Sequence, residues 1–251
     1  MLGKIMGLSR WSWAAFGKHP AARDYFQINL ASPLVVAFSQ WVENGFNRVP
    51  EDQKRTRVCS WRFWSRGQKK GTLLCGLGKS SSDSIGRPYP MMVLGEGTMA
   101  QWEKYWHLLP FGLGPTWDRM EYVATRHQPD LQQLENEINY LAKPWDDWEG
   151  IRNRRRQHED MDNLNLSKKI IMSDISEKAR SLESEQKLMI SLNGETADDP
   201  FQMAGAWHLG INRQFSGIPS TVFMGGTTEN TYLVLFSRPL SSEDFLSLWT
   251  V

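Results

Sequence analysis

The sequence predicts an α+β fold, in which helices flank a mainly antiparallel sheet within a single domain. Apolar runs rich in β-forming residues come in neighbouring pairs separated by turn residues, and helical apolar spacing occurs in separate blocks. The strands therefore do not alternate strictly with helices, which favours α+β over a parallel α/β sheet. The 251 residues can bury a full core. No internal repeat or low-complexity linker marks a boundary, so we treat 1–251 as one domain.

The first 100 residues predict one helix and three strands. Ser32, which precedes a proline, can cap a helix over about 33–45. The apolar runs 57–64 and 72–77 are joined by a polar loop that contains glycine, and this spacing predicts a β-hairpin. A third strand is expected at 91–94, after a turn region rich in Ser, Gly and Pro.

The rest of the chain predicts more helices, a charged segment and a second group of strands. The segment 149–187 contains nine basic and eight acidic residues, and we expect it to be exposed. The other predicted elements are helices over 99–109, 130–141 and 245–249 and strands over 187–192, 217–226 and 231–237.

Composition excludes several classes of function. Lys and Arg number 29 against 28 Asp and Glu, and the net charge of +1 creates no overall field that would attract nucleic acid or an anionic membrane. No apolar run approaches the roughly 18 residues that span a bilayer. Cys59 and Cys75 form no CxxC motif, and both are expected to be buried, reduced thiols. We therefore expect a cytoplasmic protein with no nucleic-acid partner and no direct membrane insertion.

No pattern of catalytic or metal-ligating residues emerges. The five histidines are scattered without an HExxH motif, and there is no GxSxG nucleophile elbow. Gly78-Lys79-Ser80 resembles the end of a Walker A loop, but Leu73 stands where that loop needs its first glycine. A turn at a strand end is the better interpretation. We expect no enzyme activity, no catalytic residues, no metal and no cofactor.

The polar loop 81–90, between two apolar strands, is the most unusual segment. Asp83 and Arg87 are close enough in sequence to form an ion pair across a turn, and Gly86 can adopt a positive φ. Such a loop is either held for structural reasons or presented as a recognition surface. The basic cluster Arg152–Arg156 is followed by acidic residues, which favours a solvated surface over a contact for an acidic partner.

The twelve tryptophans are an unusual excess. Five of them lie outside the predicted helices and strands, and we expect some of these to be exposed as an aromatic surface: Trp11, Trp13, Trp117, Trp145 and Trp148.

Several of these residues, in the same order along the chain, resemble the signature of the TagF family, also called ImpM. An N-terminal Gly-Lys-x-Pro…Asp stretch is followed by a tryptophan-bearing strand, a Ser-x-Asp-x-x-Gly-Arg-x-Tyr-Pro loop and a later tryptophan. The matching positions are Gly17, Lys18, Pro20, Asp24, Trp61, Ser81, Asp83, Gly86, Arg87, Tyr89, Pro90 and Trp207. His19 and Arg23 depart from the Leu and Gly usual in the family, and the charged region after Glu149 matches no part of it.

The resemblance implies a cytoplasmic, non-enzymatic accessory protein of the bacterial type VI secretion system. Such a protein regulates, and typically represses, assembly or activation of the system after translation, through protein–protein binding. The implied partners are secretion components, among them the forkhead-associated (Fha) protein, and the matching residues form the binding surface or its scaffold. The alternative hypothesis is a small-molecule or nucleotide sensor with an anion site in the turn Gly76–Arg87.

Overall fold

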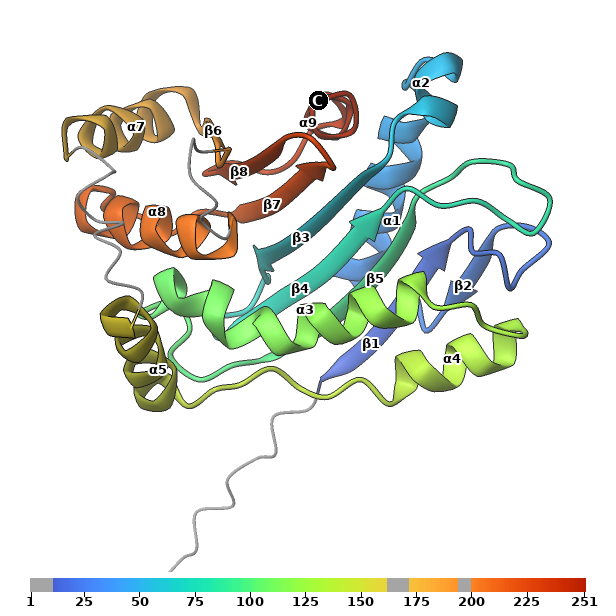
Figure 1. Ribbon diagram of the computed structural model, residues 1–251, viewed down its shortest axis with the longest axis horizontal. Coiled ribbons are helices and arrows are strands. Elements are labelled where there is room, and N and C mark those ends of the chain that lie inside the picture. Colours follow the sequence, from blue (N-terminus) through green and yellow to red (C-terminus); the bar gives the residue numbers. More distant parts are fainter. Residues whose placement is uncertain (1–10, 162–171, 194–199) are drawn as a thin grey trace, which may run out of the picture.

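The computed structural model describes residues 11–161, 172–193 and 200–251. Their centre is an eight-stranded sheet with the order β2-β1-β5-β4-β3-β7-β8-β6, in which all neighbouring strands are antiparallel (Figure 1). The predicted α+β class with a mainly antiparallel sheet is therefore confirmed. The strands are β1 (Ser12–Gly17), β2 (Phe26–Ile28), β3 (Cys59–Arg66), β4 (Thr72–Lys79), β5 (Met91–Thr98), β6 (Lys187–Ser191), β7 (Thr221–Thr227) and β8 (Thr231–Phe236).

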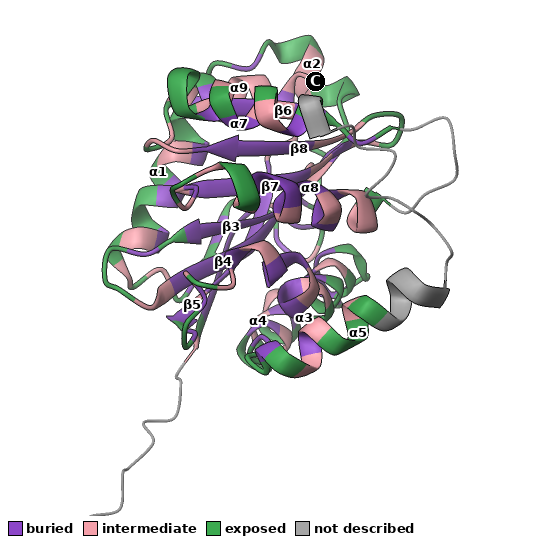
Figure 2. Cartoon of the chain, turned by 90° about the vertical axis from the view of Figure 1, so that its left-hand side faces the viewer, coloured by how far each residue is buried: buried purple, intermediate pink, exposed green. Residues whose placement is uncertain are grey.

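Helices cover both faces of the sheet (Figures 1 and 2). Helices α1 (Pro33–Phe46) and α9 (Ser242–Trp249) pack together on one face, while α2 (Glu51–Thr56) follows α1 near one end of the sheet. The opposite face carries the 3-10 helix η1 (Trp106–Leu108) and the helices α3 (Leu109–Thr125), α4 (Leu131–Asn139), α5 (Trp148–Met161), α7 (Met172–Glu185) and α8 (Pro200–Gln214).

Alternation along the strands fills both layers of the core. On β3, Trp61 and Phe63 pack toward α1 and α9, whereas Trp64 packs toward the opposite helices, and all three side chains are fully buried. The central strands β4 and β5 are buried along most of their length (Figure 2), because helices cover both of their faces. This two-sided burial explains why the runs 57–64 and 72–77 are continuously apolar.

Several predicted elements are confirmed, and their local chemistry is the expected one. The Ser32 hydroxyl accepts a hydrogen bond from the Val35 amide at the start of α1, and the Asp130 carboxylate accepts one from the Gln133 amide at the start of α4. The β3–β4 hairpin has the predicted pairing, with Trp64 opposite Cys75. The two cysteines are buried free thiols.

The prediction of a helix over 99–109 is wrong. The structure has turns there, followed by η1, and the helix α3 begins at Leu109. The sequence pattern concealed α3 because Pro110, Gly112, Gly114 and Pro115 all lie in its first half. Pro110 fits the first turn, where a missing amide hydrogen is tolerated. Outside the charged segment 149–187, four further described elements escaped prediction: β1, β2, α2 and α8.

The charged segment 149–187 includes the helices α5 and α7, with residues 162–171 outside the described part. Both helices are amphipathic. Ile151 on α5 and Ile175, Ala179 and Leu182 on α7 are buried, while most of the charged side chains described on these helices are exposed or half-buried. The apolar sides of both helices thus extend the core.

Candidate functional site

The sheet register brings two distant segments together at one end. A single transverse row of the sheet contains Gly17, Met91, Lys79 and Ser60, on β1, β5, β4 and β3. The chain that leaves β1 therefore lies beside the chain that connects β4 to β5, and the Ser84 amide donates to the Ala22 carbonyl at 2.9 Å. Ten matching signature residues lie on these two segments: Gly17, Lys18, Pro20, Asp24, Ser81, Asp83, Gly86, Arg87, Tyr89 and Pro90.

Gly17 is required where the two segments touch. Its φ is +117°, a conformation that L side chains rarely adopt. A Cβ atom at this position would lie 1.9 Å from the Pro90 carbonyl oxygen, well inside van der Waals contact. The close approach of the two segments at Pro90 therefore depends on glycine at position 17.

Asp83 is the centre of the connecting loop, and its side chain is completely buried. Its Oδ2 atom lies 2.6 Å from Arg87 Nε and 3.0 Å from Lys18 Nζ. Its Oδ1 atom accepts the backbone amides of Arg87 at 2.9 Å and Ile85 at 3.2 Å. The predicted ion pair between Asp83 and Arg87 is confirmed, and Lys18 from the other segment completes it. We call the connecting segment 81–90, together with Lys18 and Asp24 that bind to it, the locked loop.

The electrostatics of Asp83 follow from these contacts. Burial by itself would raise its pKa, but the Arg87 amide, the Lys18 and Arg87 side chains and the Ile85 amide all stabilise the carboxylate. Their combined effect exceeds that of burial, and the pKa of Asp83 lies far below its usual range. Asp83 is thus ionised near neutral pH and too weakly basic to act as a general base.

Arg87 extends the locked loop to the surface. Its Nη2 atom donates to the Arg23 carbonyl at 2.8 Å and lies 3.2 Å from Asp24 Oδ2. Position 23 contributes only its backbone to this contact, so an arginine can stand there in place of the usual glycine. Gly86 has a φ of +81°, as predicted for the turn. Beside it, Tyr89 packs its ring edge-on against the Tyr25 and Phe46 rings and fixes the loop to α1.

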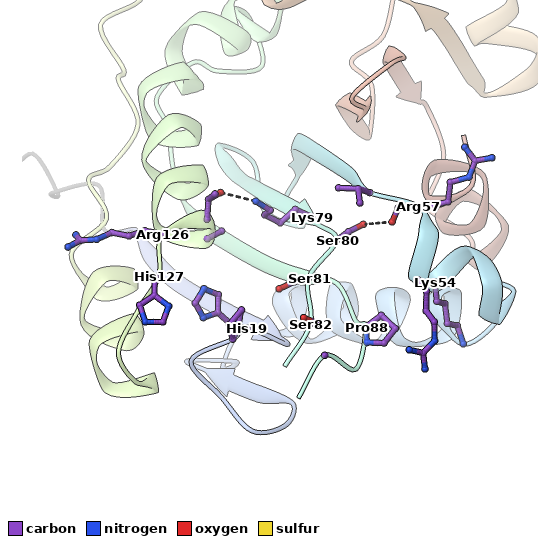
Figure 3. A pocket seen from close by; sticks show the side chains of 16 residues that line it. His19, Lys54, Arg57, Lys79, Ser80, Ser81, Ser82, Pro88, Arg126 and His127 are labelled. Atoms are coloured by element: carbon purple, nitrogen blue, oxygen red, sulfur yellow. Dashed lines mark hydrogen bonds between the residues drawn. The ribbon is translucent and has the colours of Figure 1, made fainter. Parts of the chain in front are cut away.

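The other side of the locked loop borders an open pocket of about 590 Å³, which we call the basic pocket (Figure 3). Ser81 and Gly86 of the loop line it together with His19 and Pro20, which follow β1. Lys79 lies at the end of β4, and the remaining walls come from α2 and the chain after it and from the end of α3. The further lining residues are Lys54, Arg55, Arg57, Val58, Ser80, Ser82, Pro88, Ala124, Thr125, Arg126 and His127.

The charge of the basic pocket is mostly uncompensated. Among the described lining residues there is no Asp or Glu. Lys54 pairs with Glu51 outside the pocket, and Arg57 donates to the Val251 backbone oxygen. Arg55, Lys79 and Arg126 form no ion pair with any carboxylate in the described part of the chain.

Two pKa shifts reflect this environment. The pKa of His19 is lowered, first by burial and then by the positive charge of Lys79 and by His127. Figure 3 shows the His19 and His127 rings near each other at one end of the pocket. The pKa of Lys79 is also lowered by burial, although Glu121 opposes this. Glu121 is itself bound by Arg62 at 2.7 Å.

The structure changes the alternative hypothesis of an anion site in the turn Gly76–Arg87. Residues 76–79 are not a turn, because they form the second half of β4. The interpretation of Gly78-Lys79-Ser80 as a strand end is the correct one. Within the segment, residues 79–82 together with Gly86 line the basic pocket.

The two matching tryptophans lie in the core, away from the locked loop. Trp61 is fully buried against α9 and donates from its indole nitrogen to the Leu248 carbonyl at 3.1 Å. Trp207, on α8, is buried in the opposite layer. Both side chains are buried in the core, on opposite faces of the sheet, so we assign both a packing role.

Of the five tryptophans expected to include exposed ones, Trp145 alone is substantially exposed, at 41%. The Arg154 guanidinium stacks on its ring at 3.3 Å, which links this aromatic surface to the Arg152–Arg156 cluster. Trp11 is half-buried. Trp13, Trp117 and Trp148 are buried, since β1, α3 and α5 place them against the core.

His208 has a structural position. It is completely buried and lies between the Ala204 carbonyl, 2.7 Å from Nδ1, and the Trp64 indole nitrogen, 3.5 Å from Nε2. Burial lowers its pKa to about 4, so the ring is neutral near pH 7. The described residues contain no group of three or more His, Cys, Asp or Glu side chains suited to a metal ion. None of the described helices has both the length and the apolar character to cross a membrane.

Sequence reasoning missed the basic pocket as a whole. Its cations come from separate regions of the chain, and only the antiparallel pairing of β3, β4, β5 and β1 brings them to one end of the sheet. No single segment carries a signal for it. The nearest indication was Gly78-Lys79-Ser80, whose spacing does not fit a Walker A loop.

Comparisons with known proteins agree with this architecture. The crystal structure of PA0076 from Pseudomonas aeruginosa PAO1 superimposes with a TM-score of 0.53 over 95% of this chain and 94% of that one, at 14% sequence identity, which shows a shared fold. Among proteins with curated descriptions, none matches the chain. Residues 14–141, slightly more than half of the chain, match the TagF N-terminal domain, a type VI secretion system-associated family. The chain therefore belongs to the TagF family of type VI secretion system-associated proteins.

Proposed function

We propose that this protein is a non-enzymatic regulator of the type VI secretion system that binds another component and holds it inactive. Membership of a secretion-associated family supports a partner within that system. The forkhead-associated protein is the partner that we test first, and the cytoplasm is where we expect the two to meet. Within this proposal the protein represses assembly or activation after translation.

The observation that carries the proposal is the outer surface of the locked loop. Ile85 exposes 69% of its area at the tip, and the side chains of Arg87 and Asp24 beside it are 46% and 67% exposed. The contacts of Asp83 fix the backbone beneath them. A rigid loop loses little conformational entropy on binding, so it suits recognition of another protein.

The same contacts favour binding over catalysis. The Asp83 carboxylate is saturated by two cations and two amides, and its pKa is too low for proton transfer near neutral pH. We therefore assign the locked loop to positioning and recognition.

The test uses Ile85→Asp in the full chain. Because the Ile85 side chain is exposed, this change should leave folding intact, and it should reduce recovery of the secretion component by at least about tenfold, equivalent to about 1.4 kcal/mol. Pull-down at native expression from the host cytoplasm, followed by mass spectrometry, measures the recovery.

Tyr140→Asp is the matched control. Tyr140 is 84% exposed and follows α4, where Asn139 binds Asn29 near the start of β1, at the opposite end of that strand from the locked loop. This control should retain the partner. Recovery of no type VI component by the wild-type protein would overturn the proposal.

The direction of regulation is tested in the host. Deletion of the gene should increase secretion by the type VI system, and excess protein should suppress it. Ile85→Asp in excess should fail to suppress. Reduced secretion after deletion would show an activator instead of a repressor.

A further inference from the structure

We propose that the basic pocket is a binding site for a small phosphorylated molecule. This inference goes beyond the proposed function, because it concerns the inner side of the locked loop and a ligand of a different chemical class. It rests on the convergence of positive charge, on free hydroxyl groups and on the size of the pocket.

The first argument is the charge. Arg55 and Lys79 come from α2 and the end of β4, and no described carboxylate pairs with either of them. Arg126 also borders the pocket, but its guanidinium donates to the Tyr122 hydroxyl at 3.0 Å and points away from the pocket in Figure 3. Like charges brought together by the fold repel one another, which costs free energy unless an anion or water compensates. His19, buried at one end, has its pKa lowered partly by Lys79, so the positive potential reaches into the pocket.

The second argument is the set of hydrogen-bond donors. Among the described residues, the Ser81 and Ser82 hydroxyls have no hydrogen-bond partner, and Figure 3 shows both on the segment of chain that follows Lys79 and Ser80. Lys79 Nζ is held by Thr125 Oγ1 at 2.8 Å, which orients the ammonium group. Arginine forks, a lysine and hydroxyl donors are the groups that recognise phosphoryl oxygens. Lining carboxylates, which would repel such a group, are absent from the described lining residues.

The third argument is size. A volume of about 590 Å³ lies within the range of small-molecule sites and exceeds what a bare phosphate ion fills. The ligand class is therefore an organic phosphate, such as a nucleotide or a sugar phosphate. An extended nucleic acid fits less well, because the whole chain has a net charge of only +1.

The pocket is also rigid on the side that carries the serines. Ser82 pairs with Pro88 in an isolated β-bridge, and the Tyr89 amide donates to the Ser81 carbonyl at 3.0 Å. These contacts hold the backbone of both serines in place before a ligand arrives, which lowers the entropy lost on binding.

The experiment is isothermal titration calorimetry on the full chain with ATP, fructose 1,6-bisphosphate, inorganic pyrophosphate and, as an uncharged comparison, adenosine. Phosphatidylglycerol vesicles test the lipid source of the same phosphate chemistry. We expect at least one soluble phosphate to bind, no binding of adenosine, and weaker binding as salt screens the charges. No binding of any soluble phosphate at millimolar concentration, or binding to the vesicles alone, overturns the proposal.

Variants locate the site. Lys79→Gln and Arg55→Gln should each weaken binding by at least about tenfold, and Ser82→Asp should abolish it by placing a carboxylate among the groups that would donate hydrogen bonds to the phosphate. Lys70→Gln is the matched control, because Lys70 is an exposed lysine that precedes β4 at the opposite end from Lys79. Equal weakening by Lys70→Gln would show non-specific charge attraction and would overturn the proposal.

Two further measurements separate the possible causes. Melting temperatures without ligand should be similar in the wild type and all four variants, which shows that lost binding is not lost folding. Ile85→Asp should bind the phosphate normally, since Ile85 does not line the pocket. Loss of partner binding and loss of phosphate binding are thus distinguishable, and either proposal can fail alone.

Discussion

The locked loop and the basic pocket share two chain segments, yet their charges are arranged in opposite ways: the loop pairs its charges, and the pocket, which is completed by α2 and the end of α3, leaves some of them unpaired. In the locked loop, Lys18, Asp24, Asp83 and Arg87 form one compensated network. In the basic pocket, a few residues away, Lys79 has no carboxylate bound to it in the described chain. Ion pairs that satisfy one another leave little for a ligand, whereas unpaired cations bordering a cavity are available to one.

The difference teaches how to interpret the family signature. Most of its charged and glycine positions fix the shape of the loop, as Gly17, Asp83 and Arg87 do. Residues outside the signature, such as Arg55 and Lys79, supply positive charge to the pocket. In this protein the signature residues therefore identify the structural framework of the locked loop, whereas the unpaired cations lie in the basic pocket beside it.

The largest effect expected in the locked loop is that of Gly17→Ala. The new Cβ would collide with the Pro90 carbonyl oxygen in a backbone conformation that alanine disfavours, so the free energy of unfolding should fall by more than about 3 kcal/mol. Chemical denaturation measures it. Gly71→Ala is the control, because Gly71 has a φ of +78° with no atom near the added Cβ, and it should cost about 1 kcal/mol. Equal costs would show that the contact with Pro90 is unimportant.

Asp83→Asn should have the next largest effect. The amide cannot compensate Lys18 and Arg87, so the melting temperature at pH 7 should fall. Because the folded pKa of Asp83 is depressed, its contribution is complete above the unfolded pKa of about 3.9 and is lost as pH falls toward the folded value. The difference in melting temperature between Asp83→Asn and the wild type should therefore become smaller below about pH 4. A difference independent of pH would exclude the ion pairs as its cause.

The smallest expected effect lies in the basic pocket. Lys79→Gln removes the positive charge that, after burial, does most to lower the pKa of His19. The pKa of His19 should rise but stay below its ordinary value, because burial remains. Titration of the histidine ring protons by NMR measures this shift. Lys70→Gln should leave it unchanged, and an unchanged value in Lys79→Gln would show that the pocket charge is compensated.

Much of the fold was predictable where local chemistry and packing agree. The cap at Ser32, the β3–β4 hairpin and the turn between Asp83 and Arg87 each depend on neighbours in the sequence. The helix α3 was not predictable, since its proline and glycines oppose helix formation and tertiary contacts override them. Gly112, for example, lets Ile151 approach closely from α5.

The candidate site divides in the same way. The pair Asp83–Arg87 lies four residues apart and was predicted, whereas Lys18 lies 65 residues before Asp83 and joins only through the pairing of β1 with β5. The basic pocket depends entirely on such long-range pairing. Its residues have no common spacing that a sequence pattern could reveal.

The positions of the two cysteines have a practical consequence. Cys59 packs in the layer beneath α1 and α9, and Cys75 packs in the opposite layer beneath α3. Burial raises the pKa of Cys59 to about 11 and that of Cys75 further still, so neither thiol reacts readily while its layer is closed. Their separate alkylation rates would therefore report the local opening of each half of the molecule, without any engineered probe.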